Sequence, residues 1–423
     1  MKKGVYGLFK LLNISYKKTM KLKLEANIII VIDALKKIMI IFLGPFLTAY
    51  FIKTSSESII DLSIYYIFSY ILLGIGSFIV ASIVKNKFRI GMFRIGVIIS
   101  FIYIMTIVIL KDKVVDHLGL ISILYGISQS TYWFPYNLFV INKIDNQERT
   151  DYTVKKNIIV STVGVLCPIL LGTIITATNF ELTAIIILII SLIQIVLSFM
   201  LTPEKNINTL KKYNLLDSLK RIRKNKQIKK MFLVEFLIGF SISDGALGTL
   251  ITILIFNVFK TNMNLGIISS ISTVLSIITI KLYGKYSKNK SDKKALIISS
   301  IIPVISVFIV LMNTNNITII IYSFCYEIFV NGILSLSRTI RLFNMSDSSI
   351  IQKDDQSEFF SLREGILNLG RIVSYTILLI AEISSNVVTL NFALIILTLS
   401  IPLMGYILKD IEKFEGEKNG TSK

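Results

Sequence analysis

Ionisable side chains lie inside long apolar stretches of this sequence. Each such group costs roughly 2.5–3.5 kcal/mol to place in a membrane on insertion scales, so it needs a partner or a water-filled cavity. Groups of this kind carry protons, form gating ion pairs or bind charged solutes. The residues concerned are Asp33, Lys36, Lys37, Glu235, Asp244, Glu327, Arg338 and Arg371.

A polar stripe crosses residues 317 to 338. Ser323, Glu327, Asn331, Ser335 and Arg338 follow one another at helical steps, which places them on one face of a helix. Glu327 lies roughly 15 Å from the nearer end of this stretch at a helical rise of 1.5 Å per residue, which is close to a membrane midplane. We therefore expect Glu327 to be a proton-binding carboxyl and Asn331 to line a cavity. The alternative is a neutral glutamic acid that only hydrogen-bonds a neighbouring helix.

The other acidic residues lie at different depths within their apolar stretches. Asp244 lies near the middle of its apolar stretch and is the second candidate for proton coupling. Glu235 and Asp33 lie near the ends of theirs, where a structural or gating charge pair is the simpler interpretation. Asp33 and Lys37 have the favourable i, i+4 order for an intrahelical pair. Lys36 points elsewhere, and we expect it to extend toward the membrane surface.

Residues 118 to 142 carry aromatic and amide side chains without charge. Tyr125, Gln129, Trp133, Tyr136 and Asn137 fall on one helical face, with Tyr132 beside them. Such a surface suits an amphipathic, sugar-bearing or cationic ligand through ring stacking, cation–π contact and hydrogen bonds. Gln129 and Trp133 are too deep for an aromatic belt at the outer membrane interface, so these residues are predicted to line a substrate cavity.

Arg371 cannot lose its proton, so within an apolar stretch it requires an anionic partner or an anionic substrate. Asp33, Glu235 or Glu327 could supply the partner, and the sequence does not distinguish them. Recognition of a cation by the carboxyls and recognition of an anion by Arg371 predict opposite ligand charges. Both alternatives stay open at this point.

The composition indicates that most of the chain is embedded in lipid. Apolar residues make up 53% of the 423 residues, charged residues only 17%, and the mean hydropathy is +0.71. Two cysteines, Cys167 and Cys325, and one histidine, His117, disfavour disulfide frameworks, zinc enzymes and cysteine–histidine hydrolases. No GxxxxGK[ST] motif for binding nucleotide phosphates occurs. No cofactor, metal site or enzymatic activity is therefore expected.

Twelve stretches are long and apolar enough to cross a membrane as helices. They cover residues 27 to 52, 61 to 84, 90 to 110, 118 to 142, 157 to 177, 182 to 201, 231 to 258, 264 to 283, 294 to 312, 317 to 338, 361 to 383 and 386 to 407.

Lysine and arginine alternate between the segments that join these stretches. The segment 202 to 230 holds ten of them, whereas 178 to 181 and 313 to 316 hold none. The positive-inside rule then places both termini and the 202 to 230 segment on the cytoplasmic side of the membrane. We therefore expect a multi-pass protein of the plasma membrane. The net charge of +20 is thereby explained by topology, so nucleic acid is not an expected partner.

The predicted spans repeat. Five of the six span starts in the second half follow their counterparts by 203 or 204 residues. The predicted organisation is a basic N-terminal segment (1–26), a six-helix half (27–201), a basic linker (202–230), a second six-helix half (231–407) and a tail (408–423). Parallel six-span halves joined by a long cytoplasmic loop are typical of transporters.

The chain resembles the major facilitator superfamily over nearly its whole length. VKNKFRIGMFR (84–94) and GKYSKNKSDKK (284–294) occupy the place of its basic loop motif, although Lys85 and Lys288 stand where the acidic residue is expected. FLGPFLTAYF (42–51), STYWFPYNLFVINKIDNQER (130–149), SDGALGTLITILIF (243–256) and LREGILNLGRI (362–372) look like the YqgE-like branch of bacterial facilitators. The resemblance implies twelve helices in two repeats, with the first, fourth, seventh and tenth spans around a central cavity.

We therefore expect a secondary active transporter that moves a small or amphipathic solute by alternating access. Proton coupling, export and a monomeric state are the favoured expectations. The alternatives are a facilitated uniporter, a glycolipid translocase and, in a different class, a membrane sensor or scaffold that transports nothing.

Overall fold

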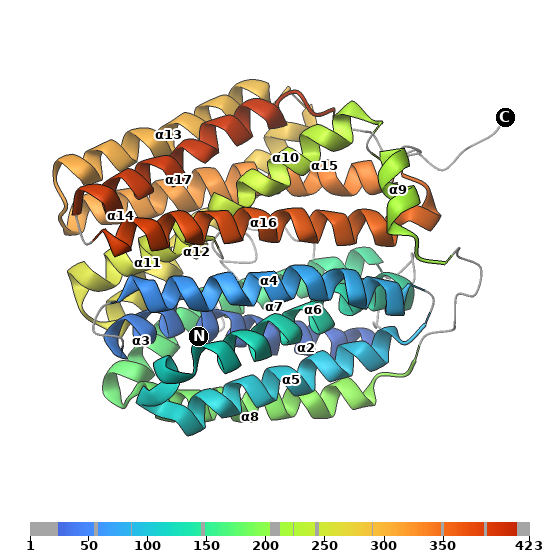
Figure 1. Ribbon diagram of the computed structural model, residues 1–423, viewed down its shortest axis with the longest axis horizontal. Helices are drawn as coiled ribbons and strands as arrows, with labels where there is room; N and C mark the ends of the chain where they lie inside the picture. The colour runs from blue at the N-terminus through green and yellow to red at the C-terminus, as the bar shows by residue number, and fades with distance from the viewer. Residues whose placement is uncertain are drawn as a thin grey trace, which may run out of the picture.

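The computed structural model describes residues 24–54, 58–85, 87–144, 149–203, 212–222, 224–241, 245–289, 291–347, 351–384 and 387–412. These residues form helices without any strand. The all-helical fold class predicted from the sequence is confirmed. Figure 1 shows the first half of the chain as one layer of helices and the second half as another, with the helices running lengthwise in both.

The first layer contains the helices of the N-terminal half. They are α2 (Leu24–Ile41), the π-helical turn η1 (Phe42–Phe46), α3 (Leu47–Thr54), α4 (Ile59–Val84), α5 (Arg89–Leu110), the 3₁₀ turn η2 (Lys111–His117), α6 (Leu118–Lys143), α7 (Arg149–Ala177) and α8 (Phe180–Met200).

The second layer follows a short helix, α9 (Leu215–Ile222), in the linker. It contains α10 (Lys226–Ser241), α11 (Ala246–Phe259), α12 (Asn262–Asn289), α13 (Lys293–Met312), α14 (Asn316–Cys325), the π-helical segment η3 (Tyr326–Leu334), α15 (Ser335–Asp347), the 3₁₀ turn η4 (Lys353–Asp355), α16 (Gln356–Ile383) and α17 (Val387–Leu408).

Ten stretches of the described chain are long and apolar enough to cross a membrane. One of them, Arg89–Val140, contains both α5 and α6, and the predicted first span, α2 to α3, is not among the ten. That span carries Asp33, Lys36 and Lys37 within its first helix, which lowers its hydropathy. The multi-pass architecture is thus confirmed, while the count of twelve spans stays a prediction.

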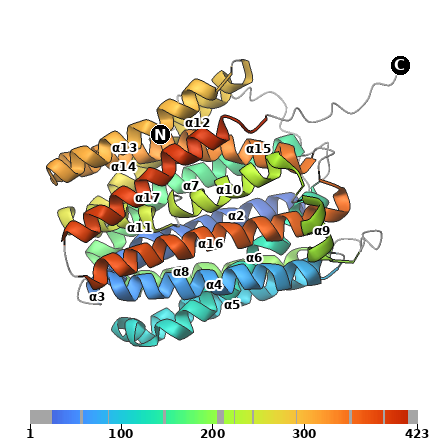
Figure 2. The same ribbon diagram turned by 45° about the horizontal axis from the view of Figure 1, so that its top comes forward.

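The packing partners repeat between the two layers. Helix α5 packs on α8 as α13 packs on α17, and α2 packs on α8 as α10 packs on α17. The turned view in Figure 2 shows α5 at one edge of the molecule and α13 at the opposite edge. This equivalence is what a duplicated six-helix unit produces. The residue limits assigned to the two halves and the linker stay a prediction.

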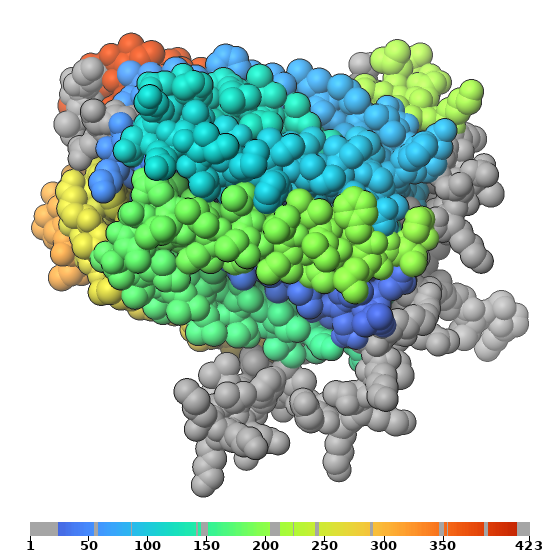
Figure 3. All heavy atoms as spheres, turned by 90° about the horizontal axis from the view of Figure 1, so that it is seen from below, coloured from blue at the N-terminus to red at the C-terminus, as the bar shows by residue number. Residues whose placement is uncertain are grey.

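The outer faces are apolar, as a lipid environment requires. Along α8, the exposed side chains include Leu182, Ile185, Ile189, Ile193 and Val196. Figure 3 looks onto this face, where α5 and α8 lie side by side. The small and polar side chains of α8, such as Ser191 and Gln194, are buried on its opposite side.

Two helix pairs make the most extensive contacts between the layers, α4 with α16 and α7 with α12. The α7–α12 pair meets almost backbone to backbone. A Cβ atom added to Gly266 on α12 would lie 2.2 Å from the carbonyl oxygen of Pro168, and one added to Gly172 would lie 2.4 Å from that of Asn262. Glycine is required at both positions because any side chain would push the helices apart.

An ion pair crosses between the layers at the end of the bundle that carries α9, which we call the linker end (Figure 1). Lys85 Nζ, at the end of α4, lies 2.6 Å from Glu358 Oε1 on α16 and donates to the carbonyl oxygen of Asp354 at 2.6 Å. Both side chains are buried, at 2% and 1% exposure. Glu358 Oε1 also accepts from the backbone N–H of Asn214 in the linker, at 3.0 Å. Lys85, which belongs to the first copy of the basic loop motif, therefore links the two halves.

The linker helix α9 docks beside this pair. Arg221 Nε donates to Asp355 Oδ2 at 2.9 Å, and Ser218 Oγ donates to Asp355 Oδ1 at 2.8 Å. Burial by itself raises the pKa of Asp355, but the hydrogen bonds from Arg221 and Ser218 outweigh it and hold the pKa below its usual value. The docking contact is therefore strongest when Asp355 is ionised and weakens in acid.

We expect the Lys85–Glu358 pair to be essential for stability. Replacing Lys85 with Met, or Glu358 with Gln, leaves a buried charge without its partner, which costs about 3–5 kcal/mol. The exchanged pair Lys85→Glu with Glu358→Lys is expected to recover a large part of that loss. Thermal unfolding in detergent measures all three variants. Single variants as stable as the wild-type protein would show that the pair is dispensable.

Candidate functional site

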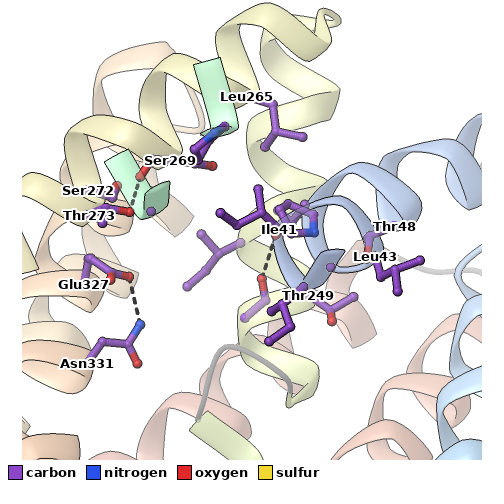
Figure 4. Close-up of a pocket in the computed structure, with 18 of the residues that line it drawn as sticks. Ile41, Leu43, Thr48, Thr249, Leu265, Ser269, Ser272, Thr273, Glu327 and Asn331 are labelled. Carbon is purple, nitrogen blue, oxygen red and sulfur yellow. Dashed lines mark hydrogen bonds between the residues drawn. The ribbon is translucent and has the colours of Figure 1, made fainter. Parts of the chain in front are cut away.

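A cavity of about 380 Å³ lies between the two halves. The N-terminal half contributes residues of α2, η1, α3, α4, α6 and α7 to its lining, and the C-terminal half those of α11, α12, α14 and η3. Figure 4 shows Ile41 and Thr48 on one side of this space and Glu327 and Asn331 on another. The volume falls in the range of small-molecule sites in proteins.

The helices around this cavity are interrupted. The first span turns π-helical at Phe42–Phe46, where Pro45 provides no N–H for the helical ladder, and a Cβ atom on Gly44 would meet nothing within 4 Å. The tenth predicted span is π-helical at Tyr326–Leu334. The seventh is divided into α10, which ends at Ser241, and α11, which begins at Ala246. Such irregular segments are frequent where helices line a binding site.

The wall formed by the C-terminal half contains the predicted carboxyl. Asn331 Nδ2 donates to Glu327 Oε2 at 2.8 Å, and both residues line the cavity with Ser323. Figure 4 shows Ser272 and Thr273 of α12 beside them. The polar stripe read from the sequence therefore does reach the cavity at these three residues. Its fifth member, Arg338, lies apart from them in an ion-pair cluster described below.

The wall formed by the N-terminal half contains an amide and the sole tryptophan. Trp133 Nε1 donates to Gln129 Oε1 at 3.0 Å, and both residues line the cavity, as do Tyr66, Tyr70 and Tyr125. Tyr66 stacks on Tyr375 with ring centroids 4.6 Å apart. Stacking on Tyr375 therefore fixes the orientation of the Tyr66 ring in the cavity wall.

Lys36 also belongs to this wall, contrary to the expectation that it extends to the membrane surface. Its side chain is 2% exposed, and its Nζ lies 4.1 Å from the ring centroid of Tyr132 and 5.8 Å from that of Trp133. The rings stabilise the ammonium group inside the bundle by cation–π attraction, which the sequence of α2 alone does not reveal. Lys37 lines the same cavity.

Three residues predicted for the cavity lie elsewhere. Tyr132 is buried and accepts a hydrogen bond from Gln194 of α8 at 3.2 Å, while Tyr136 donates to Asp33 of α2. Asn137 is exposed on α6 and is absent from the cavity lining. The face of α6 that meets the cavity is therefore narrower than predicted, because Tyr136 is bound to α2 and Tyr132 to α8.

Asp33 belongs to a cluster confined to the N-terminal half. Its Oδ2 lies 3.0 Å from Lys156 Nζ and accepts from Tyr152 Oη at 3.3 Å, both on α7. The predicted pairing with Lys37 is wrong, since the two lysines of α2 face the cavity while Asp33 faces α6 and α7. Intrahelical spacing could not reveal Lys156, which is distant in sequence.

Glu235 belongs to a corresponding cluster in the C-terminal half. It is fully buried, and its carboxylate binds Arg338 Nε at 2.5 Å and Arg363 Nε at 2.7 Å. Arg363 also pairs with Glu364. Two guanidinium groups therefore share one buried carboxylate, and the second acid offsets the remaining charge.

Arg371 forms no ion pair with Asp33, Glu235 or Glu327, the three acids proposed as its partner. Its guanidinium lies 4.8 Å from the ring centroid of Tyr70, and its Nη1 donates to Asn368 Oδ1 at 3.1 Å. Since Tyr70 lines the cavity, Arg371 lies behind this wall. Asp244, the second candidate for proton coupling, is outside the described residues, so its role stays a prediction.

Tyr66 and Tyr70 of α4 were missed by the sequence reasoning. Their spacing of four places both on one helical face, and this aromatic pair within an apolar stretch was the available signal.

We expect Glu235 and Glu327 to respond differently to neutralisation. Glu235→Gln leaves two guanidinium groups around an uncharged amide, so the free energy of unfolding is expected to fall by about 3–5 kcal/mol. Glu327→Gln preserves a hydrogen-bonding group beside Asn331 and is expected to change it by less than about 1 kcal/mol. Thermal unfolding in detergent compares the two. An equal loss of stability would contradict the distinction between a structural and a cavity carboxyl.

Comparison with known proteins identifies the family. The model of the Major Facilitator Superfamily matches residues 28–374. The uncharacterized protein YqgE of Bacillus subtilis (strain 168) is 24% identical over 383 residues, which cover 88% of this chain and 86% of the relative.

Solved structures of the nucleoside transporter NupG share the fold. An aspartate-to-alanine mutant of NupG matches with a TM-score of 0.69 and 14% identity, covering 92% of this chain and 99% of that one. A further NupG structure matches with a TM-score of 0.64 and 16% identity, covering 93% and 99%. The family match and the helical fold agree with a membrane transporter and not with an enzyme. This chain belongs to the Major Facilitator Superfamily.

Proposed function

We propose that the protein moves a small or amphipathic solute across the plasma membrane by alternating access, driven by protons. The observation that carries this proposal is the cavity of about 380 Å³ between the halves, lined by both of them and by their interrupted helices. A site shared by two rigid halves becomes accessible from each side in turn when the halves rock against each other.

The contacts between the halves support such a motion. At the end of the bundle opposite the linker, α3 packs on α11, and Thr176 Oγ1 accepts from the backbone N–H of Met263 at 3.1 Å. At the linker end, Lys85 and Glu358 form the crossing pair. By the positive-inside rule, the linker end faces the cytoplasm, as do both termini. These contacts are separate, so each can open while the other holds.

Glu327 is the proposed proton-binding group, with Asp244 as the second candidate. Glu327 lines the cavity on the C-terminal side, where its protonation changes the charge of the wall that meets the solute. Its hydrogen bond from Asn331 keeps the carboxyl in one orientation. Asp33 and Glu235 are each bound by basic side chains within their own half, which favours structural roles for them.

Export is the proposed direction, and a monomer is the proposed functional unit. The mixture of aromatic side chains with few charges in the cavity suits amphipathic solutes, for which export is a common direction of transport. Nucleosides also belong in the first substrate panel, since the NupG structures share the fold and the cavity offers ring-stacking side chains.

The test is flux into proteoliposomes under an imposed pH gradient. Nucleosides, aromatic acids, amphipathic cations, sugars and amino acids form the panel. Glu327→Gln is expected to lower gradient-driven accumulation at least about tenfold, as expected when a group needed for coupling is lost. Exchange of labelled for unlabelled solute without a gradient is expected to continue, because it requires no net proton movement.

The matched control is Glu382→Gln, the same chemical change near the end of α16 and outside the cavity lining. It is expected to transport as the wild-type protein does. Normal gradient-driven accumulation by Glu327→Gln would contradict coupling through this residue. Accumulation that is unaffected by a protonophore would favour a facilitated uniporter.

A further inference from the structure

Lys36 is a buried cation in the cavity wall. Its described contacts are with the rings of Tyr132 and Trp133, and no carboxylate of the described residues lies within 4.0 Å of its Nζ. Ring faces attract an ammonium group but accept its N–H bonds poorly. This ammonium group is 2% exposed, and the part of the chain that the structure describes does not provide the acceptors that a buried charge requires. A ligand in the cavity can supply them.

The charges of the described lining favour an anion. Among the described residues of the lining, Lys36 and Lys37 are basic and Glu327 is acidic. The described lining therefore carries more basic than acidic side chains, whether Glu327 is ionised or protonated. A cationic solute would be repelled more strongly once Glu327 takes up a proton.

The aromatic side chains of the lining favour a planar ring. Trp133 is oriented by its hydrogen bond to Gln129, at 3.0 Å, and Tyr66 by its stacking on Tyr375. Rings held in this way stack against a flat ligand at little cost in side-chain entropy. A volume of about 380 Å³ accommodates one or two rings with a short substituent.

We propose that the cavity binds a ring-bearing monoanion, with the anionic group at Lys36 and the ring against Trp133 and the tyrosines of α4. The opposite end of such a ligand faces Glu327 and Asn331, so it touches both halves. This assignment names the substrate class of the transport site proposed above and rests on that site. It also decides between the two ligand charges that the sequence left open, in favour of the anion.

Trp133, the sole tryptophan of the chain, provides the readout. The full-length protein in detergent is titrated with phenylacetate, phenylacetamide and phenethylamine, which share a ring and carry an anion, a neutral amide and an ammonium group. Excitation at the red edge of the tryptophan band avoids the absorption of the probes. Phenylacetate is expected to change the emission saturably and to bind at least about tenfold more tightly than the other two, which corresponds to about 1.4 kcal/mol.

Variants connect this preference to Lys36. Lys36→Met, which keeps the length of the side chain without its charge, is expected to abolish the preference for phenylacetate, and Lys36→Arg is expected to retain it. Lys143→Met is the matched control, because Lys143 pairs with Glu25 near the linker end and lies outside the cavity lining. Unchanged thermal unfolding of each variant shows that it is folded.

Three results would overturn the proposal. They are equal binding of the three probes, the absence of any anion-specific emission change, and an undiminished preference in the Lys36→Met variant. The transport function is tested separately by flux in proteoliposomes. Lys36-dependent binding of the anion without flux of any solute would refute transport and leave the ligand class standing. Flux of neutral solutes alone would refute the ligand class and leave transport standing.

Discussion

A charge placed between membrane helices must be compensated by a neighbouring helix, and this constraint organises the structure. Asp33 on α2 is bound by α6 and α7, and Glu235 on α10 is bound by α15 and α16. The same number of residues separates Asp33 from Glu235 and Tyr136 from Arg338. Each half therefore fastens its first helix to its fourth and fifth through an acid at an equivalent place, and each half is expected to move as a unit.

Charged side chains that are paired with a neighbouring helix and charged side chains that line the cavity have different roles, because only the former have their charge compensated by described residues of the protein. Asp33 and Glu235 hold helices of one half together, and Lys85 with Glu358 joins the two halves. Glu327 and Lys36 face the central cavity, where we propose that a proton and a solute complete their contacts. Neutralising a structural acid is expected to lower stability, and neutralising a cavity acid is expected to lower transport, so the two roles can be measured separately.

The sequence predicted the parts of the site that depend on hydropathy and on one helix at a time. The all-helical membrane fold follows from hydropathy, and helical spacing placed Glu327 beside Asn331 and Gln129 beside Trp133. The sequence could not predict which side chains of other helices pair with these residues. The i, i+4 rule suggested Lys37 for Asp33, but Lys156 of α7 takes that position, and the rings that hold Lys36 in the cavity come from α6.

Regular periodicity also fails where the helices are irregular. The π-helical segment from Tyr326 to Leu334 changes the angular spacing of the stripe, and Arg338 emerges beside Glu235, outside the cavity lining. Tyr132 and Tyr136 lie on or beside the helical face of α6 that carries Trp133, but they pack against α2, α5 and α8 and do not line the cavity. The loop motif gives a further example, since Lys85 joins the halves at the position where the resemblance leads one to expect an acid.

Alternating movement of the two halves is the central claim, and paired distance measurements test it most directly. Spin labels at Thr178 and Met263 report on the end opposite the linker, and labels at Ser82 and Gln356 report on the linker end, after Cys167 and Cys325 are replaced by serine. When pH or solute is changed, one distance is predicted to lengthen while the other shortens. Two distances that stay fixed under every condition, in protein shown to be folded, would contradict alternating access.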